Sequence, residues 1–200
     1  MKMFYTPRRP SAQRRRSDPR WSGSPDRPAP DLEDNRGEKS VIPKTACSGC
    51  NGLFCAIDGP KHPYLTASAG CWARFGQSLA LHYSDQRYWP AHQLLTDAYA
   101  LQHSEGDDRR AIRSTHVHLA ALFAQVCLEQ PEARVVSLRR ALSGFDYHKL
   151  PGAWPTPSAS IADVDVSEPE RHLATVATFA RTVMTDWSEF QDLAEKLCKV

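Results

Sequence analysis

The chain has 200 residues, of which 41% are apolar and 24% are charged, and its formal net charge is +2. This length is enough for one domain of ordinary size with its own hydrophobic core. The chain contains no run of about 18 apolar residues, which argues against a membrane span. No apolar segment follows the basic residues at the N-terminus, which argues against a secretory signal. We therefore expect a cytoplasmic protein whose six cysteines are thiols or metal ligands rather than disulfides.

The N-terminal segment differs in composition from the rest of the chain. Residues 1–42 are polar, rich in Pro, Arg, Ser and Asp, and nearly free of periodic apolar positions. Such a segment cannot bury enough apolar surface to offset its ordering entropy, so we predict a disordered basic tail. Residues 1–40 carry a net charge of +4 and the other 160 residues carry −2. The predicted domain, residues 43–200, therefore has no nucleic-acid footprint, and only the tail, through Arg14–Arg16, could contact nucleic acid.

Apolar residues recur at helical spacing along most of this domain, and no segment shows comparable strand-like alternation. The third predicted helix is the most apolar, so we expect it to be central. Residues 145–167 lack this period and are expected to form an extended connection. The segment Ser167–Glu170 has the pattern of a capping box that starts the last helix. We predict an all-α bundle of about five helices with a loop-built N-terminal cap. The helices are expected over residues 71–83, 90–103, 108–130 and 131–144, and from the capping box to about 198, the last as one long helix or two in line.

The densest group of potential metal ligands lies in the cap, between residues 46 and 71. Cys47-Ser48-Gly49-Cys50 has the pattern of a zinc knuckle, in which two thiolates two residues apart take adjacent tetrahedral positions. One such pair supplies only half of the ligands of a structural zinc site. We predict that the zinc ligands are Cys47, Cys50, His62 and Cys71, with Cys55 or His92 as substitutes.

Two other interpretations of the thiols stay open at this point. The cysteines could be buried thiols of a reduced protein, without a metal. They could also have a redox or catalytic role, although no β-α-β pattern surrounds the Cys-x-x-Cys pair.

A second group of potential functional residues lies on the second and third predicted helices. His92 and His103 share one helix face but lie about 16 Å apart, so one ion cannot bind both. On the third helix, His116 and His118 point to nearly opposite sides. The apolar stripe places His116 inward, as a core histidine. The residues expected to line a pocket between the two helices are His92, Asp97, Tyr99, His103 and His118.

Several segments of the chain resemble the successive blocks of a bacterial family of unknown function. They are CSGCNGLF, IDGPKHPYLTASAGCW, YWPAHQLLTDAYALQHS and STHVHLAAL. The family shows Cys-x-Gly-Cys, Asp-Gly-Pro-x-His, Pro-Gly-Cys-Trp, His-x-Leu-x-x-Asp-x-Tyr-x-x-Gln-His and Val-His-Leu in the same order. The resemblance is strong over residues 45–130 and weak elsewhere, and Ala69 stands where the family has proline.

This resemblance implies a functional site without implying a reaction. It also favours His118 over His116 as the inward-facing histidine, in contrast to the apolar stripe. The positions on which it falls are Cys47, Cys50, Asp58, His62, Cys71, Trp72, His92, Asp97, Tyr99, Gln102, His103 and His118.

The sequence is compatible with functions of different classes. The first is a helical binding module, pinned by zinc, that contacts a protein or a small molecule. The second is a metal-assisted enzyme in which a His/Asp pair from the second and third helices transfers protons. Four protein ligands around the ion would favour the first, and three ligands plus water the second. A nucleic-acid binder that acts through the basic tail is a weaker third hypothesis.

Overall fold

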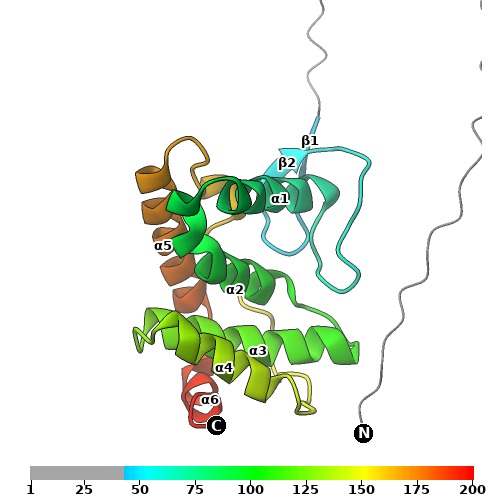
Figure 1. Cartoon of the computed structure of the whole chain (residues 1–200). Helices are drawn as coiled ribbons and strands as arrows, with labels where there is room; N and C mark the ends of the chain where they lie inside the picture. Colours follow the sequence, from blue (N-terminus) through cyan, green and yellow to red (C-terminus); the bar gives the residue numbers. More distant parts are fainter. Residues whose placement is uncertain (1–42) are drawn as a thin grey trace, which may run out of the picture. The chain divides into compact units, whose positions relative to one another are not determined.

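The computed structural model describes residues 43–200, and the predicted disordered tail lies outside the described residues. Residues 43–200 form six α-helices, three short 3₁₀ segments and one two-stranded hairpin (Figure 1). The all-α fold class is thus confirmed. The described part has one helix more than the five expected, because the last helical segment is divided in two. None of these helices combines the length and the apolar character that crossing a membrane requires.

The cysteine-rich cap begins with a hairpin that the sequence analysis did not predict. Strand β1 (Lys44–Ala46) pairs antiparallel with β2 (Leu53–Cys55). Strands of three residues are too short for a period-2 alternation to be recognised. The turn between them is closed by a hydrogen bond from the Cys47 amide to the Gly52 carbonyl at 2.9 Å. Asn51 adopts a left-handed conformation with φ of 58°, which asparagine tolerates better than most residues.

Helices α1 and α2 follow the cap and are joined by a 3₁₀ segment. Helix α1 (Ala69–Ser84) begins after Ser68, whose hydroxyl accepts the Cys71 amide as an N-cap. The 3₁₀ segment η1 (Gln86–Ala91) contains Pro90, so α2 (His92–His103) starts two residues later than predicted.

The middle of the fold is α3 (Arg109–Val126), which packs against α2, α4, α5 and α6. This confirms the central position predicted for the most apolar helix. Asp108 caps α3 by accepting the amides of Arg110 and Ala111. Helix α4 (Glu132–Leu142) lies against α3, and small side chains of α3 form an apolar cluster with it.

The C-terminal part corrects two predictions. The Ser167–Glu170 capping box is wrong, because α5 (Pro169–Asp186) has no side-chain cap. The capping box is instead made by Ser160 and Asp163, around the 3₁₀ segment η2 (Ile161–Asp163) of the long connection.

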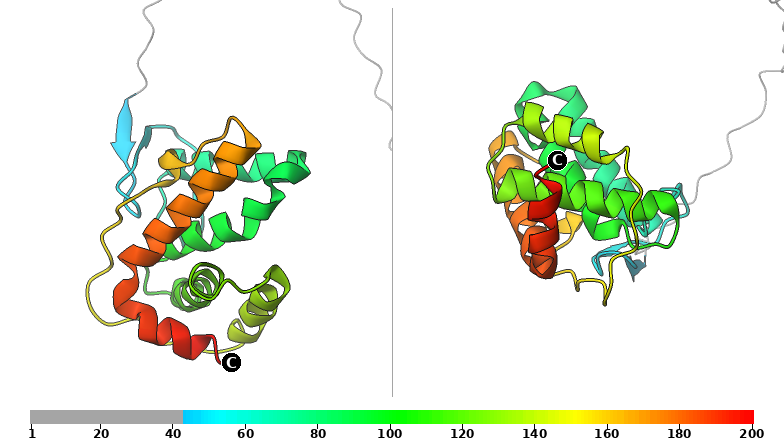
Figure 2. Two further views of the ribbon diagram at one scale, coloured as in Figure 1. Left: turned by 90° about the vertical axis from the view of Figure 1, so that its left-hand side faces the viewer. Right: turned by 90° about the horizontal axis from the view of Figure 1, so that it is seen from below.

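The last helical segment also breaks after Asp186, whose carboxylate accepts the Ser158 amide at 2.9 Å. The 3₁₀ segment η3 (Ser188–Phe190) and α6 (Gln191–Leu197) follow, and Figure 2 shows α6 turning away from the direction of α5. Trp187, at the break, is buried edge-on against Trp154, with ring centroids 4.8 Å apart. The connection over residues 145–167 therefore contacts the end of α5 near its own midpoint, through Trp154 and Ser158.

Candidate metal centre and neighbouring polar clusters

Three elements distant in sequence bring four potential metal ligands together. The hairpin turn supplies Cys47 and Cys50, the first turn of α1 supplies Cys71, and the last residue of α2 is His103. Their sulfur and nitrogen atoms all lie within 4.8 Å of one another, and all four residues are buried. This thiol cluster, defined as Cys47, Cys50, Cys71 and His103, could hold a metal ion.

The distances within the thiol cluster are those of atoms arranged around a common centre. His103 Nε2 lies 3.7 Å from Cys47 Sγ and 3.5 Å from Cys71 Sγ. The sulfurs of Cys50 and Cys71 are 3.8 Å apart, far beyond the roughly 2 Å of a disulfide bond. All six cysteines are free.

The orientation of the His103 ring is fixed by its own helix. Its Nδ1 lies 2.8 Å from the Tyr99 carbonyl oxygen, and a carbonyl can only accept, so Nδ1 carries the proton. With Nδ1 engaged in this way, Nε2 is directed toward the thiols. A histidine ligand is typically oriented in this way, by a hydrogen bond from its other nitrogen to a carbonyl or carboxylate.

Glycine is required at position 49 because the hairpin turn approaches α2 closely. A Cβ atom on Gly49 would lie 2.5 Å from Cδ2 of His103 and 3.0 Å from the Thr66 carbonyl oxygen. The same turn lets the Ser68 amide donate to Cys47 Sγ at 3.3 Å. The Gly-Cys step of the knuckle therefore serves packing against His103 as well as the turn itself.

Hydrogen bonds among the three thiols make them unequal in acidity. The hydrogen bond from Cys50 holds the pKa of Cys47 far below its usual range. The same interaction raises the pKa of Cys50, and the interaction with Cys47 raises that of Cys71. Neighbouring S–H groups thus stabilise one thiolate, whereas a second negative charge at this distance is strongly disfavoured. A cation at the centre would remove that penalty.

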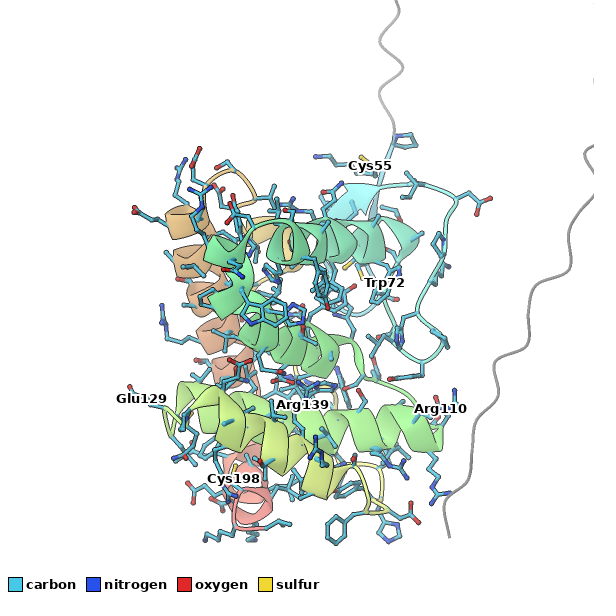
Figure 3. The ribbon with its side chains drawn as sticks, in the orientation of Figure 1. Cys55, Trp72, Arg110, Glu129, Arg139 and Cys198 are labelled. Carbon is cyan, nitrogen blue, oxygen red and sulfur yellow. The ribbon has the colours of Figure 1, made fainter. Side chains whose placement is uncertain are left out.

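The structure brings together the three predicted cysteines with His103, and places His62 elsewhere. The His62 ring packs against Tyr64 and Trp72, with centroids 4.3 and 5.0 Å away. Cys55, a predicted substitute, is exposed at the end of β2 (Figure 3). Spacing along the chain favoured the nearby His62, whereas His103 was expected in the pocket between the second and third predicted helices.

The pocket expected between α2 and α3 is divided among three clusters. Tyr99 joins the thiol cluster, because its hydroxyl lies 3.5 Å from Cys71 Sγ. Asp97 is fully buried and pairs with His118, with 2.6 Å between Oδ1 and Nδ1. The other oxygen, Oδ2, accepts the side-chain amides of Gln93 at 2.9 Å and Gln125 at 2.7 Å.

Arg139 of α4, which is labelled in Figure 3, adds a positive charge to this cluster. Its Nε lies 3.6 Å from Asp97 Oδ1. Together, Asp97, His118, Gln93, Gln125 and Arg139 form the aspartate cluster, in which the carboxylate is surrounded by donors.

His92 lies in a chain of three imidazoles that the sequence analysis did not identify. His172 Nδ1 donates to the Asp165 carbonyl at 2.6 Å, so its Nε2 accepts from His82 at 2.7 Å. His82 Nδ1 then accepts from His92 Nδ1 at 3.3 Å. Burial lowers the pKa of all three and brings that of His82 to about 4. The chain consists of neutral rings with a defined proton order.

His116 and His118 of α3 both pack against other segments of the chain, on different sides of the helix. His116 is buried, donates to the Ile112 carbonyl at 2.9 Å and stacks on Tyr147. The core position predicted for His116 is therefore confirmed. His118 faces α2 as well, because the central helix is covered on opposite sides.

Together these features define a helical domain with a buried cluster of three cysteines and one histidine. The chain belongs to a family of unknown function, DUF5946, whose profile matches residues 45–188. The resemblance to a family of unknown function is thereby confirmed. Comparison with curated proteins and with solved structures finds no match.

Proposed function

We propose that the protein is a helical binding module whose hairpin is pinned to α1 and α2 by a structural zinc ion. The proposed ligands are Cys47, Cys50, Cys71 and His103. Zinc at about 2.3 Å from sulfur and about 2.0–2.1 Å from nitrogen gives tetrahedral edges of about 3.8 Å between sulfurs and about 3.5 Å between sulfur and nitrogen. The edges found here, 3.8 Å for sulfur to sulfur and 3.7 and 3.5 Å for sulfur to nitrogen, agree with that geometry. This agreement carries the proposal.

The donor set also favours zinc over other ions. Thiolates are soft ligands, whereas calcium and magnesium bind oxygen. A tetrahedral set of three sulfurs and one nitrogen is a common composition of structural zinc sites. The uneven thiol acidity gives a further reason, because a divalent cation would allow all three cysteines to be thiolates.

Coordination distinguishes the binding module from the metal-assisted enzyme. Four protein atoms complete the tetrahedron and leave no position for water, which favours a structural site. The acid–base pair of the enzyme hypothesis would be Asp97 and His118, which bond to each other and contribute no atom to the thiol cluster. The site therefore supports an ion that holds the cap in place.

The proposal includes the compartment and the kind of partner. A reducing cytoplasm would keep the thiols available for zinc. The partner would be a protein or a small molecule that contacts the helical domain, and nucleic acid would be bound only through the basic tail.

Elemental analysis of the purified protein tests the site, with two matched pairs of variants. We expect about one zinc per chain in the wild type. Cys50→Ser and His103→Ala should lose the ion, whereas Cys55→Ser and His62→Ala should keep it. Cys55 is a fair control because it lies in the same hairpin but is exposed.

A wild-type protein that stays free of zinc after incubation with the ion would contradict the proposal. Loss of zinc from His62→Ala but not from His103→Ala would replace His103 by His62 as the fourth ligand.

A further inference from the structure

A pocket of about 240 Å³ lies over α3, apart from the thiol cluster. Four polar side chains of α3 line it: Arg110, Arg113, Ser114 and His118. Arg110 is at the N-terminal end of the helix (Figure 3). The pocket therefore combines two guanidinium groups, a hydroxyl and an imidazole on one helix.

Two polar atoms of this pocket are buried without a hydrogen-bond partner in the described residues. They are the Ser114 hydroxyl and Nε of Arg113. Ser114 is only 7% exposed, so water cannot freely replace a missing partner. Buried polar groups are nearly always hydrogen-bonded, and an exception calls for an explanation. Arg113 Nε can only donate and the Ser114 hydroxyl can donate, so one acceptor in the pocket could satisfy both.

His118 presents one ring nitrogen to the pocket. Its Nδ1 is occupied by Asp97 at 2.6 Å, which leaves Nε2 for a ligand. The pocket therefore has an imidazole nitrogen in its wall beside the two arginines.

The two arginines of the pocket differ in their acidic partners. One NH₂ group of Arg113 lies 3.3 Å from the exposed Asp146 carboxylate, which also pairs with Arg109. Arg110 makes no ion pair with a residue of the 43–200 segment, and only its backbone amide bonds to Asp108. One guanidinium charge at the pocket is therefore left without an acidic partner.

We propose that this pocket binds the oxyanion of a small ligand, either a phosphate or a carboxylate group. The Ser114 hydroxyl and Arg113 Nε would donate to the oxyanion, the His118 ring would lie beside it, and Arg110 would supply charge from the rim. Guanidinium groups suit both anions, because their parallel N–H donors match two oxygens. The proposal does not depend on the zinc site, since none of these residues belongs to the thiol cluster.

Binding can be measured on the full-length protein, as purified, by titration with sodium phosphate or sodium acetate. Sodium chloride at equal ionic strength is the reference, and the histidine ring signals are followed by NMR. We expect saturable shifts of the His118 signals with at least one of the two oxyanions, and the tighter one identifies the ligand class. No saturable shift with either anion would overturn the proposal.

The decisive variant is Ser114→Ala. It removes a buried hydroxyl that has no protein partner, so the melting temperature should stay unchanged or rise. The dissociation constant for the anion should increase about tenfold, the effect of one lost hydrogen bond to a charged group. Ser137→Ala is the matched control, because that exposed serine lies on α4 and bonds only to Ala133. Equal affinities of the two variants would contradict the proposed contact.

Arg110→Gln provides an independent test, because its exposed side chain has no ion pair to lose. It should weaken anion binding at low salt and leave the melting temperature unchanged. Unchanged affinity in Arg110→Gln and in Ser114→Ala together would exclude this pocket as the site.

Discussion

The thiol cluster and the aspartate cluster are both buried, but protein donors satisfy only one of them. The Asp97 carboxylate receives three side-chain hydrogen bonds and a nearby guanidinium. The three thiols receive two backbone amides, at Cys47 and Cys50, and one phenol, at Cys71, apart from His103 and one another. Donors of this number stabilise one thiolate, whereas three thiolates require a cation.

This contrast shows how the same fold handles buried charge in two ways. The aspartate cluster is closed by side chains from α2, α3 and α4, so it needs nothing beyond the protein. The thiol cluster joins a short hairpin to two helices. Besides the cysteines, the strands bury only Phe54 in the core, and a two-stranded hairpin is marginal by itself. Perturbing each cluster should therefore have different consequences.

Removal of the metal should have the largest effect. Chelation of the zinc-loaded protein should lower the free energy of unfolding by about 5 kcal/mol or more, because binding energy at a structural site is folding energy. Thermal melts with and without chelator, followed by zinc addition, measure this change. Amide exchange should become fast first in β1 and β2. Identical melting curves with and without chelator would show that the thiol cluster, like the aspartate cluster, needs no metal for stability.

Replacement of Asp97 should come next. Asp97→Ala leaves His118 and the Gln93 amide without their acceptor and removes one of the two acceptors of the Gln125 amide. We therefore expect a loss of about 3–5 kcal/mol in denaturant unfolding. Zinc content should remain that of the wild type. Asp146→Ala is the control, since that carboxylate pairs with Arg109 and Arg113 at the exposed surface and should leave stability essentially unchanged. Equal effects of the two substitutions would refute a special role for the buried carboxylate.

The imidazole chain predicts a loss of stability in acid. The pKa of His82 is lowered from 6.5 to about 4 in the folded protein, so the unfolded chain binds protons first as the pH falls. Stability contributed by neutral His82 is thus complete above pH 6.5 and disappears between pH 6.5 and about 4, a loss of about 3 kcal/mol.

Acid also releases thiolate ligands from a metal, so wild type must be compared with His82→Phe at each pH. The variant should be less stable at pH 7 but should lose less on acidification. Parallel pH profiles of the two proteins would contradict this assignment.

Two glycine substitutions should give the smallest effects, with opposite signs. Gly49→Ala forces a methyl group against His103 and Thr66, which should cost about 2 kcal/mol and weaken zinc binding. A Cβ on Gly76, inside α1, meets no atom within 4 Å. Gly76→Ala should therefore stabilise the protein by up to about 1 kcal/mol through helix propensity. Thermal melts and competition with a zinc indicator measure both, and stabilisation by Gly49→Ala would contradict the close approach.

The helices could be predicted from the sequence because their signals are local. Apolar residues at the helical period located α1, α2, α3 and α4 to within a few residues, and the strong stripe of α3 indicated its central position. The errors are also local in origin. Pro90 fits a 3₁₀ turn as well as a first helical turn, and the short strands β1 and β2 contain too few residues to show alternation.

Part of the thiol cluster was also determined by the sequence. The Cys-x-x-Cys turn places Cys47 and Cys50 close together whatever surrounds them, and Cys71 follows within reach of a short loop. The Cys-x-x-Cys spacing also predicts that Gly49 lies in a turn. The sequence alone does not show that His103 occupies the space that a side chain at position 49 would fill.

The tertiary structure alone decided which polar residues meet. His103 reaches the thiols, Asp97 reaches His118, and His82 reaches His172 because helix packing juxtaposes faces that are 32, 21 and 90 residues apart in the chain. Helical periodicity fixes the face on which each residue lies but not the partner that the face receives. That partner depends on the crossing of α1, α2, α3 and α5, which is determined by side-chain packing across the whole core.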